Sequence, residues 1–468
     1  MAGIKDMSLY LPRYRVNRES IAGAWGKIAS GWRAVANYDE DAITMAADAV
    51  SRLEVNSDNT VGLYFASSRP PYQGSSNASV LAQVLGIRPD AFVQDGETSG
   101  RGATSALRNA ICLLDSGGRG EVLVAAAETW LTRPGSEEEL DGSDSAAALK
   151  LSRDPGVAEF ITGTSYRSDV LDRWRIDGRQ FSIGGDGRFT SRYGFEDPCV
   201  KAVESILCSS NLSPGDVRWA AVAAPGLKQY RAVLKKIGIG SQQILEKVYA
   251  ETGNCGLSMP LVLLYRALQS ASPGDIIILA GYSGWIDAML LRVTEDITAF
   301  QAKNPVGSFM GGARIDYPEM LKMKRVIPLE ELVPSSSQVQ YWRERDELLR
   351  LSGQKCTVCS SVQFPRRRVC WRCGTRDRFE EYQLARTGQI YTFTIDHLFP
   401  SPFGPAIMAV IDLDGGGRIY TQMTDCAGDE VAIGLKVKIC LRKYHQGGDF
   451  NNYFWKARPI PGAGGVKI

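Results

Sequence analysis

The stretch Asp275-Ile-Ile-Ile-Leu-Ala280, followed by Gly281-Tyr-Ser-Gly284, decides the fold class of this chain. A short run of β-branched and apolar residues that ends in a glycine loop is typical of a buried strand. Similar runs occur at 61–66, 121–127 and 219–223. Each lies beside a helical or Gly/Ser-rich stretch, so the sequence predicts an α/β fold with buried strands.

A short repeat accompanies these strands. Ser-Pro-Gly-Asp occurs at 213–216 and again at 272–275, and each copy precedes one of the apolar runs. The repetition suggests an internal duplication. Residues 38–50, which read Tyr-Asp-Glu-Asp-Ala-Ile-Thr-Met-Ala-Ala-Asp-Ala-Val, predict an amphipathic helix. Its three acidic residues, 39–41, would be favourable in the first turn.

Length and composition limit the class of protein. A chain of 468 residues is too long for one hydrophobic core, so two or three domains are expected. With 44% hydrophobic and 23% charged residues, the composition excludes a collagen, a disordered chain and a small disulfide scaffold. No apolar run approaches the roughly 18–20 residues that span a bilayer, and the N-terminus does not resemble a secretory signal. We therefore expect a cytoplasmic protein without a membrane segment.

Charge is distributed unevenly along the chain. Residues 355–468 contain 16 Lys/Arg and 10 Asp/Glu, a net charge of +6, which leaves −4 for the first 354 residues out of a total of +2. A basic module favours an anionic ligand. The two histidines, His397 and His445, both lie in the basic part. Any mechanism located in the first 354 residues must therefore work without histidine.

Four of the ten cysteines form two C-x-x-C knuckles, Cys356-Thr-Val-Cys359 and Cys370-Trp-Arg-Cys373. This spacing predicts a tetrahedral Zn²⁺ site with four thiolate ligands. Disulfides are the alternative, and they are rare in cytoplasmic proteins. Because four thiolates leave no open position for a substrate, the predicted zinc is structural. The other six cysteines are scattered, as is usual for small core residues.

The C-terminal part predicts a helix, a ribbon and a barrel. Residues 336–352, SSSQVQYWRERDELLRL, predict a capped helix that leads into the zinc ribbon. Alternating strands with Gly-rich turns follow, and Gly415-Gly-Gly417 is typical of a hairpin turn. Such short strands predict a small barrel, most simply an OB-fold. They are expected at 389–394, 406–412, 418–423 and 436–441.

Several motifs together resemble a known family. The first 330 residues resemble the archaeal and bacterial 3-hydroxy-3-methylglutaryl-CoA synthases, which are members of the thiolase superfamily. The last 115 residues resemble the zinc-ribbon/OB-fold partners of such enzymes, which are usually separate subunits. The N-terminal motifs are Leu9-Tyr-Leu-Pro-Arg-Tyr-Arg-Val, Tyr38-Asp-Glu-Asp-Ala-Ile-Thr-Met-Ala, Asp172-Arg-Trp-Arg, Gly187-Arg-Phe-Thr190 and Gly253-Asn254. The C-terminal marks are the knuckles, Phe364-Pro-Arg and Tyr453-Phe-Trp-Lys-Ala-Arg-Pro.

The resemblance implies a fold and a domain order. We expect duplicated thiolase-like α-β-α-β-α layers over residues 1–330. A helix and a rubredoxin-like zinc ribbon should follow at 336–385, and an OB-fold barrel at 386–468. Thiolase-like domains generally pair as two-fold dimers, so at least a homodimer is expected. A complex with another thiolase-family protein is possible in such a family.

The departures from the family pattern concern its catalytic side chains. The resemblance places Gly100 at the position of the nucleophilic cysteine and Ala223 at that of the histidine. The acid/base glutamate falls near Ser68. An acyl-enzyme condensation is therefore not expected, but aldol or retro-aldol cleavage of a CoA thioester needs no covalent nucleophile. It needs a base, an oxyanion hole and a proton donor.

Two residues are our main candidates for this chemistry. Tyr282, in the late glycine loop that carries a second cysteine in thiolases, is the first choice for proton transfer. Asn254 matches the family's asparagine that orients the thioester oxygen. Cys255 and Ser99 are weaker candidates for a stand-in nucleophile, and no histidine is present to activate the serine.

Two basic residues are candidates for contacts with CoA. Lys228 matches a region that approaches the CoA phosphates in the family, and Arg188 could either contact the cofactor or hold its own loop. The basic barrel, with residues 366–368, Trp371, Arg372 and 453–455, suits either the nucleotide end of CoA or nucleic acid. Fusion to a thiolase-like domain favours CoA, so no nucleic acid partner is expected.

Three functions follow. The preferred one is an enzyme that makes or breaks a carbon–carbon bond of a CoA thioester without the Cys/His/Glu triad. The second is a noncatalytic CoA-binding or channelling partner of an active thiolase or synthase. The third is a synthase or acyltransferase of the parent type with an unaligned nucleophile. The sequence does not identify the acyl chain, the pathway or the direction of reaction.

Overall fold

The computed structural model describes residues 2–329, 335–399, 401 and 403–460. The chain forms two compact units. The first comprises Met1–Asn37, Asp41–Ala82 and Ile87–Val326, and the second comprises Tyr38–Glu40, Gln83–Gly86 and Ile327–Ile468. The predicted boundary at residue 330 and the last part of the predicted barrel, 461–468, lie outside the described residues.

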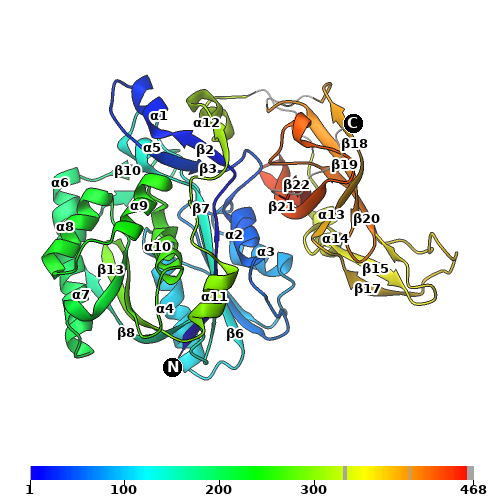
Figure 1. Ribbon diagram of the computed structural model, residues 1–468. Coiled ribbons are helices and arrows are strands. Elements are labelled where there is room, and N and C mark those ends of the chain that lie inside the picture. Colours follow the sequence, from blue (N-terminus) through cyan, green and yellow to red (C-terminus); the bar gives the residue numbers. More distant parts are fainter. Residues whose placement is uncertain (1, 330–334, 400, 402, 461–468) are drawn as a thin grey trace. The chain divides into compact units, whose positions relative to one another are not determined.

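The described residues of the first unit form one mixed sheet of nine strands (Figure 1). The strands are β1 (Gly3–Tyr10), β4 (Thr60–Ala66), β5 (Phe92–Asp95), β6 (Glu121–Glu128), β7 (Ser145–Ser152), β8 (Ala158–Arg167), β11 (Val217–Val222), β12 (Ile276–Ser283) and β13 (Trp285–Val293). Their order is β11-β12-β13-β8-β1-β7-β6-β4-β5. The four apolar runs predicted as buried strands are β4, β6, β11 and β12.

The sheet contains the same pattern twice. β4 is parallel to β6, β6 is antiparallel to β7, and β7 is antiparallel to β1. Likewise, β11 is parallel to β12, β12 is antiparallel to β13, and β13 is antiparallel to β8. Among the described residues, only the pairs Gly3–Glu159 and Ile4–Ala158 join β1 to β8. This repeated topology agrees with the predicted duplication.

Helices pack between the two halves and outside them. α4 (Gly102–Asp115) packs on β4 and β6 and also on β12, while α10 (Met259–Leu268) packs on β11 and β12 and reaches β1. α2 (Ala42–Val50) packs on β6 and β7, and α7 (Asp197–Ser209) packs on β8 and β13. The predicted α-β-α-β-α layers are confirmed.

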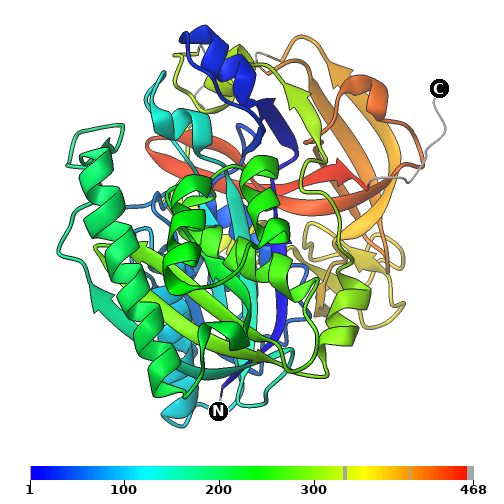
Figure 2. The same cartoon turned by 60° about the vertical axis from the view of Figure 1, so that its left-hand side comes forward.

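Smaller elements complete the first unit. In Figure 2, α6 (Gly187–Phe189), the π-helix η1 (Thr190–Glu196) and α7 form one continuous helical run on the outside of the sheet. The short strands are β2 (Tyr14–Asn17), β3 (Trp32–Val35), β14 (Ala313–Ile315) and the hairpin β9 (Arg173–Trp174) with β10 (Ile183–Gly184). The remaining helices are α1 (Arg18–Ala24), α3 (Asn77–Val84), α5 (Glu137–Asp141), α8 (Leu227–Ile237), α9 (Gln243–Glu251), α11 (Ile297–Lys303) and α12 (Tyr317–Met323).

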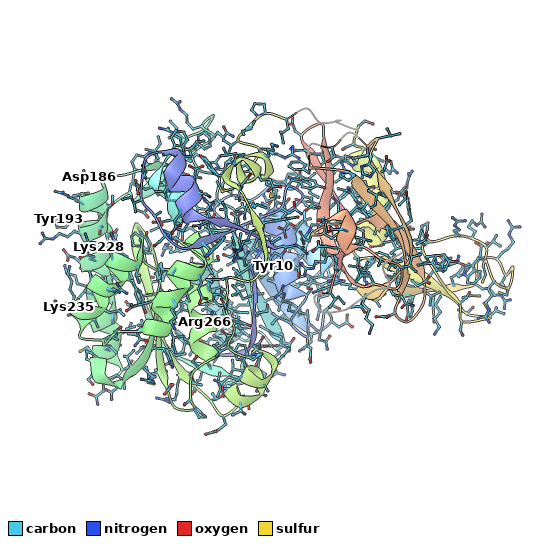
Figure 3. The ribbon with its side chains drawn as sticks, turned by 45° about the horizontal axis from the view of Figure 1, so that its top comes forward. Tyr10, Asp186, Tyr193, Lys228, Lys235 and Arg266 are labelled. Carbon is cyan, nitrogen blue, oxygen red and sulfur yellow. The ribbon has the colours of Figure 1, made fainter. Side chains whose placement is uncertain are left out.

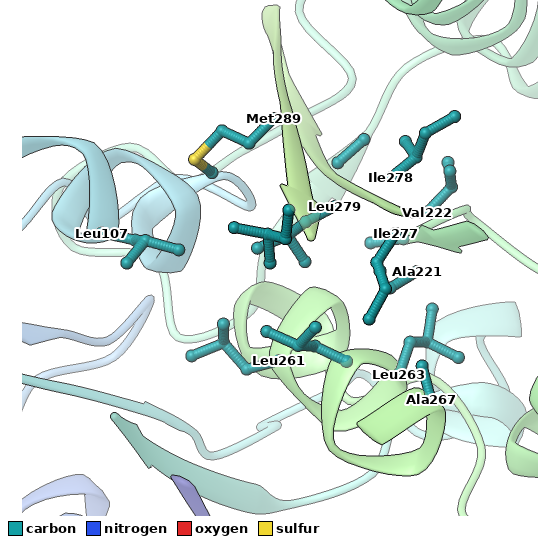
Figure 4. Close-up of a cluster of buried hydrophobic side chains, with 14 of the residues drawn as sticks. Leu107, Ala221, Val222, Leu261, Leu263, Ala267, Ile277, Ile278, Leu279 and Met289 are labelled. Atoms are coloured by element: carbon teal, nitrogen blue, oxygen red, sulfur yellow. The ribbon is translucent and has the colours of Figure 1, made fainter. Parts of the chain in front are cut away.

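Apolar contacts hold the central layer together. Leu107 of α4, Leu261 of α10 and Leu279 of β12 belong to one fully buried cluster (Figure 4). Burying a leucine side chain completely contributes about 1.5–3 kcal/mol. Because α4 packs on β12, this cluster fixes the N-terminal end of α4 against the loop that follows β12.

The helix predicted over 38–50 begins later than expected. α2 starts at Ala42, because Asp41 caps it: its carboxylate accepts from the Thr44 N–H at 3.0 Å, and the Thr44 hydroxyl bonds back to the Asp41 N–H at 2.8 Å. Asp39 and Glu40 are therefore not first-turn charges. They belong to the second unit, where Asp39 bonds to Lys456 at 2.8 Å and Glu40 pairs with Arg442 at 3.0 Å.

The second unit contains a three-stranded ribbon and a five-stranded barrel sheet. The ribbon order is β16 (Val362–Gln363), β15 (Ser352–Cys356) and β17 (Phe379–Gln383). The barrel order is β20 (Arg418–Gln422), β19 (Ala406–Leu413), β18 (Thr387–Asp396), β21 (Lys436–Gly447) and β22 (Phe450–Pro459). The ends of the sheet meet where the Thr424 N–H donates to the Ala457 carbonyl at 2.8 Å. The predicted turn at Gly415 joins β19 to β20.

The single helix predicted over 336–352 is wrong. The chain instead forms two short helices, α13 (Gln338–Arg343) and α14 (Arg345–Leu348), which are interrupted at Glu344. Val339 and Trp342 are exposed, so α13 buries little apolar surface. Short helices without such packing are marginal in water, which accounts for the break.

Candidate active site and metal centre

A cavity of about 640 Å³ lies in the first unit where several strands end. Its walls come from the segments that follow β4, β5, β6, β11 and β12, together with the hairpin region 172–191. The carboxyl ends of parallel strands meet at one edge of a sheet, which explains why these loops converge. The lining includes Ser68, Ser99, Gly100, Trp130, Asp172, Arg173, Ala223, Asn254, Gly256, Tyr282 and Ser283.

A second cavity, of about 820 Å³, lies between α8 and α9. It is lined by Leu227, Leu234 and Lys235, among others, and contains the Arg231–Glu246 ion pair at 2.6 Å. It includes none of the residues predicted to be functional. The smaller cavity is therefore the candidate active site.

Three lining residues lie at or near the positions that the resemblance assigns to the family's catalytic side chains. Ser68 is near the position of the glutamate, and Gly100 and Ala223 are at those of the cysteine and the histidine. The structure brings all three to one cavity. None carries a thiol, an imidazole or a carboxylate, and Ser68 offers only a hydroxyl.

Gly100 has no space for a side chain. A Cβ atom built there would lie 2.8 Å from the Tyr282 carbonyl oxygen and 3.4 Å from the Ser283 Cβ. α4 begins at Gly102, so the N-terminal end of a 14-residue helix lies beside this point. The positive end of that helix is retained, although the thiolate that it would stabilise is absent.

Asn254 presents an amide group to the cavity. Its Oδ1 accepts from the Gly256 N–H at 2.9 Å, and its Nδ2 donates to the Pro225 carbonyl at 3.1 Å. These bonds fix the orientation of the amide. An amide NH₂ group has two donors, so among the described contacts one N–H is left for an oxygen in the cavity.

Tyr282 is the penultimate residue of β12 and is half-buried, with its ring packed on Phe195 at a centroid distance of 4.8 Å. Burial, with the nearby Asp172 carboxylate, raises the pKa of Tyr282 above its usual value of about 10. At neutral pH the side chain is therefore a phenol that can donate a proton. Asp172 accepts a hydrogen bond from the Ser283 hydroxyl at 2.9 Å.

The two alternative nucleophiles lie in different surroundings. Ser99 lines the cavity, and its hydroxyl donates to Glu97 at 2.8 Å. Cys255 is fully buried and is not among the lining residues. Burial raises the pKa of the Cys255 thiol, which contacts the Thr252 hydroxyl at 3.7 Å. A protonated thiol away from the cavity does not suit a nucleophile.

Lys228 and Arg188 are both exposed beside the cavity. Lys228 lies between Pro225 and Gln229, which line the cavity, and Arg188 lies between the lining residues Gly187 and Thr190. Figure 3 shows Lys228 on the same side of the first unit as Asp186 and Tyr193, which flank the Arg188 segment.

Sequence reasoning missed Glu128. This residue is the last of β6, is 1% exposed, and accepts hydrogen bonds from the Ser68 hydroxyl and, at 3.1 Å, from the Leu257 N–H. Burial raises the pKa of its carboxyl, although Arg173 and the two hydrogen bonds oppose the shift. The sequence signal that could have identified Glu128 is a carboxylate residue directly after an apolar run that predicts a strand.

The four knuckle cysteines meet in the second unit. All four Sγ atoms lie within 4.8 Å of one another, with Cys356–Cys373 at 3.7 Å and Cys359–Cys370 at 3.6 Å. A tetrahedron with Zn–S bonds of about 2.3 Å has S–S edges of about 3.8 Å, so the cluster fits zinc. The Ser361 hydroxyl helps to lower the pKa of Cys370 to about 6, which favours the thiolate.

The predicted stacking surface on the barrel needs correction. Tyr453 and Trp455 are each 1% exposed, because they lie in the barrel core. They cannot stack on a purine ring. Of the other residues of this predicted surface, Trp371 is exposed. The Arg368 guanidinium already pairs with the Asp377 carboxylate at 2.8 Å.

Among the described residues, no helix has both the length and the apolar character needed to cross a membrane.

Comparisons with known proteins agree with both units. A hydroxymethylglutaryl-CoA synthase of Methanopyrus kandleri is 30% identical over 340 residues, which cover 69% of this chain and 97% of that protein. A hydroxymethylglutaryl-CoA synthase of Aeropyrum pernix is 32% identical over 311 residues, which cover 63% and 86%. Residues 381–442 match the family model described as the C-terminal OB-fold domain of ChsH2.

Solved structures are similar in fold. An HMG-CoA synthase crystallised with CoA has a TM-score of 0.64 at 16% identity, covering 72% of this chain and 95% of that one. The HMG synthase of curacin biosynthesis, in complex with acetyl donor-ACP, has a TM-score of 0.62 at 15% identity, covering 69% and 88%. At these identities the likeness concerns the fold alone.

Proposed function

Because the chain belongs to the hydroxymethylglutaryl-CoA synthase family, we propose that its cavity binds an acyl-CoA thioester. We further propose that it makes or breaks a carbon–carbon bond of that thioester by aldol or retro-aldol chemistry, without an acyl-enzyme. One observation carries this proposal. The cavity is lined by Gly100 and Ala223, where the resemblance would put the nucleophile and its base, and also by the Asn254 amide and the Tyr282 phenol.

Cleavage would proceed through an enolate. A base removes the proton of the β-hydroxyl group, the oxygen electrons form a carbonyl, and the Cα–Cβ bond breaks. Its electron pair passes into the thioester, which becomes an enolate, and a proton donor then protonates Cα. The products are a shorter acyl-CoA and an aldehyde or ketone, and condensation is the same path reversed.

The residues divide these tasks. The remaining Nδ2 N–H of Asn254 would stabilise the enolate oxygen, and one donor of this kind contributes about 10²–10³ in rate. Tyr282 would protonate Cα, since the raised pKa keeps its hydroxyl protonated at neutral pH. Lys228 and Arg188, exposed beside the cavity, would pair with the CoA phosphates.

The cysteine cluster is proposed to hold one structural Zn²⁺. Its four thiolates, Cys356, Cys359, Cys370 and Cys373, would leave no open coordination position. The metal would supply folding free energy to the ribbon and take no part in bond cleavage.

Two measurements test the proposed enzyme activity. The full chain is incubated with β-hydroxyacyl-CoA thioesters of different chain length, and release of a shorter acyl-CoA is followed by liquid chromatography and mass spectrometry. In parallel, the intact protein mass is recorded after incubation with acetyl-CoA. We expect cleavage and no covalent adduct. An acyl adduct would instead support the parent-type synthase, and binding without turnover would support the noncatalytic partner.

A further inference from the structure

The proposed cleavage needs a base for the β-hydroxyl proton, and none of the residues assigned above supplies it. The resemblance puts the family's acid/base glutamate near Ser68, whose hydroxyl is too weak a base to act alone. The described first unit has no histidine to assist it. A carboxylate in contact with Ser68 would resolve this.

Glu128, the last residue of β6, makes this contact with Ser68, which follows β4. Its Oε1 accepts a hydrogen bond from the Ser68 Oγ, and its Oε2 accepts from the Leu257 N–H at 3.1 Å. Ser68 lines the cavity, whereas Glu128 lies behind it and is 1% exposed. The serine hydroxyl therefore connects the cavity to a buried carboxylate.

The backbone at Gly256 passes close to this carboxylate. Gly256 lines the cavity, and a Cβ atom built on it would lie 2.2 Å from the Glu128 Oε2. Only glycine permits that approach, and its φ of +56° is also the left-handed conformation that glycine adopts readily. Because Gly256 has no side chain, the Glu128 carboxylate has the space that it needs beside Ser68.

Charges of both signs face Glu128. Arg173 of β9 and Arg69, next to Ser68, favour the ionised carboxylate, while Asp144 disfavours it. Burial is the largest influence and raises the pKa of Glu128 above its ordinary value of about 4.3. A base whose pKa is shifted toward the operating pH is more effective than an ordinary carboxylate.

We propose that Ser68 and Glu128 form a proton relay that acts as the base of the reaction, with Ser68 in contact with the substrate and Glu128 accepting the proton through it. The inference rests on the proposed function. As the Cα–Cβ bond breaks, the β-hydroxyl proton moves to Ser68 Oγ, and the Ser68 proton moves to Glu128. In condensation, Glu128 returns the proton by the same route, so no other reactant is needed.

Glu128→Gln tests the relay while conserving shape. We expect kcat for cleavage to fall by about 10²–10⁴, the range for a lost acid/base group. The wild-type rate should rise with pH as Glu128 loses its proton, and this limb should be absent in Glu128→Gln. Glu128→Asp, which keeps the carboxylate, should retain the limb at a reduced rate, and Ser68→Ala should lose rate as Glu128→Gln does.

Two controls separate a relay from a structural role. Glu139→Gln alters another buried carboxyl with a raised pKa, held by the Gly135 N–H at 2.6 Å and by the Tyr317 hydroxyl at 3.1 Å, and should leave kcat unchanged. Binding of acetyl-CoA, measured by calorimetry, involves no proton transfer. It should persist in Glu128→Gln if that residue acts only in the relay.

The outcomes are distinguishable. If the wild type cleaves but Glu128→Gln retains kcat and the pH limb, the relay is overturned and the proposed function stands. If Glu128→Gln loses both cleavage and acetyl-CoA binding, Glu128 is structural and the relay is again overturned. If the wild type cleaves no β-hydroxyacyl-CoA, the proposed function fails, and the relay proposed for it fails with it.

Discussion

Gly100, at the scale of single residues, is packed closely against the end of β12. The position lies beside the start of α4 and carries no thiol, and the Tyr282 carbonyl oxygen lies 2.8 Å from where a Cβ would be. The end of β12 therefore occupies the space that a side chain at this position would need.

Gly100→Cys should therefore not create a condensing enzyme. Its thiol would be crowded by the Tyr282 backbone, and Ala223 offers no imidazole to activate it. We expect no acyl adduct by intact mass after incubation with acetyl-CoA, for this variant as for the wild type. An acyl adduct on the introduced thiol, together with turnover that depends on acetoacetyl-CoA, would contradict this prediction. It would mean that another residue of the cavity activates the thiol.

Tyr282→Phe removes only the hydroxyl that we propose protonates Cα. The ring contact with Phe195 is retained, so folding should be unaffected. The expected kcat for cleavage is lower by about 10²–10⁴. Phe195→Leu, which alters the same packing and leaves the hydroxyl, is the matched control. Equal losses in the two variants would assign Tyr282 to packing alone.

At the scale of elements, the ribbon brings the sulfur atoms of four cysteines together on two turns. β16 has two residues and β17 is largely exposed, so the ribbon buries few side chains. A unit of this size needs a metal or disulfides for stability.

Cys370→Ser should lose one equivalent of zinc and destabilise the ribbon, because metal binding supplies much of the folding free energy of such sites. Zinc content by elemental analysis and amide exchange over 352–383 measure the two effects. Cys112→Ser, at an exposed cysteine outside the cluster, should change neither. Full zinc content in Cys370→Ser would exclude the four-thiolate site.

A buried ion-pair network is the second element with a measurable signature. Arg442, Lys456, Asp39 and Glu40 have side chains that are at most 1% exposed, and Lys456 is 2.8 Å from Asp39. Burial alone would raise the pKa of Asp39, but the Lys456 and Arg442 charges and the hydrogen bonds outweigh it and lower the pKa.

The network predicts acid sensitivity of the second unit. A folded-state pKa below the unfolded value of about 3.9 stabilises the fold above that pH, and this contribution is lost as pH falls through the folded-state pKa. Asp39→Asn should lower the free energy of unfolding at pH 7 by about 3–5 kcal/mol, because it leaves Lys456 without its partner. It should also weaken the acid dependence. Asp412→Asn, in an exposed pair with Arg418, should cost less than about 1 kcal/mol.

At the scale of the whole molecule, the resemblance implies at least a homodimer, and this expectation can be tested on the full chain. β5 is the last strand of its sheet, and Phe92 on it is 51% exposed. An exposed edge strand with an apolar side chain is suited to pairing across a two-fold axis.

We expect light scattering at micromolar concentration to give about twice the monomer mass of 51.1 kDa. Phe92→Asp should shift the mass toward the monomer, whereas Ile28→Asp, at a side chain that is 99% exposed and lies four residues after α1, should not. A wild-type mass near 51.1 kDa would contradict the prediction.

Some features of this protein follow from its sequence alone. The β-branched runs fix the strands, because local side-chain pattern and burial on both faces are enough to specify them. The spacing of the two C-x-x-C knuckles likewise predicts the four-cysteine cluster, since each knuckle is a local turn. No histidine occurs before residue 355, so the sequence alone excludes a histidine of residues 1–354 as a catalytic acid or base.

Other features depend on residues that are far apart in the chain. Ser68 and Glu128 are separated by 60 positions, and their hydrogen bond exists because β4 and β6 are parallel neighbours. The crowding of Gly100 by Tyr282, and the burial of Trp455 that removes it from any stacking surface, likewise depend on packing. Local pattern specifies elements, but which elements meet is decided by the free energy of packing them together, and only the tertiary structure contains that result.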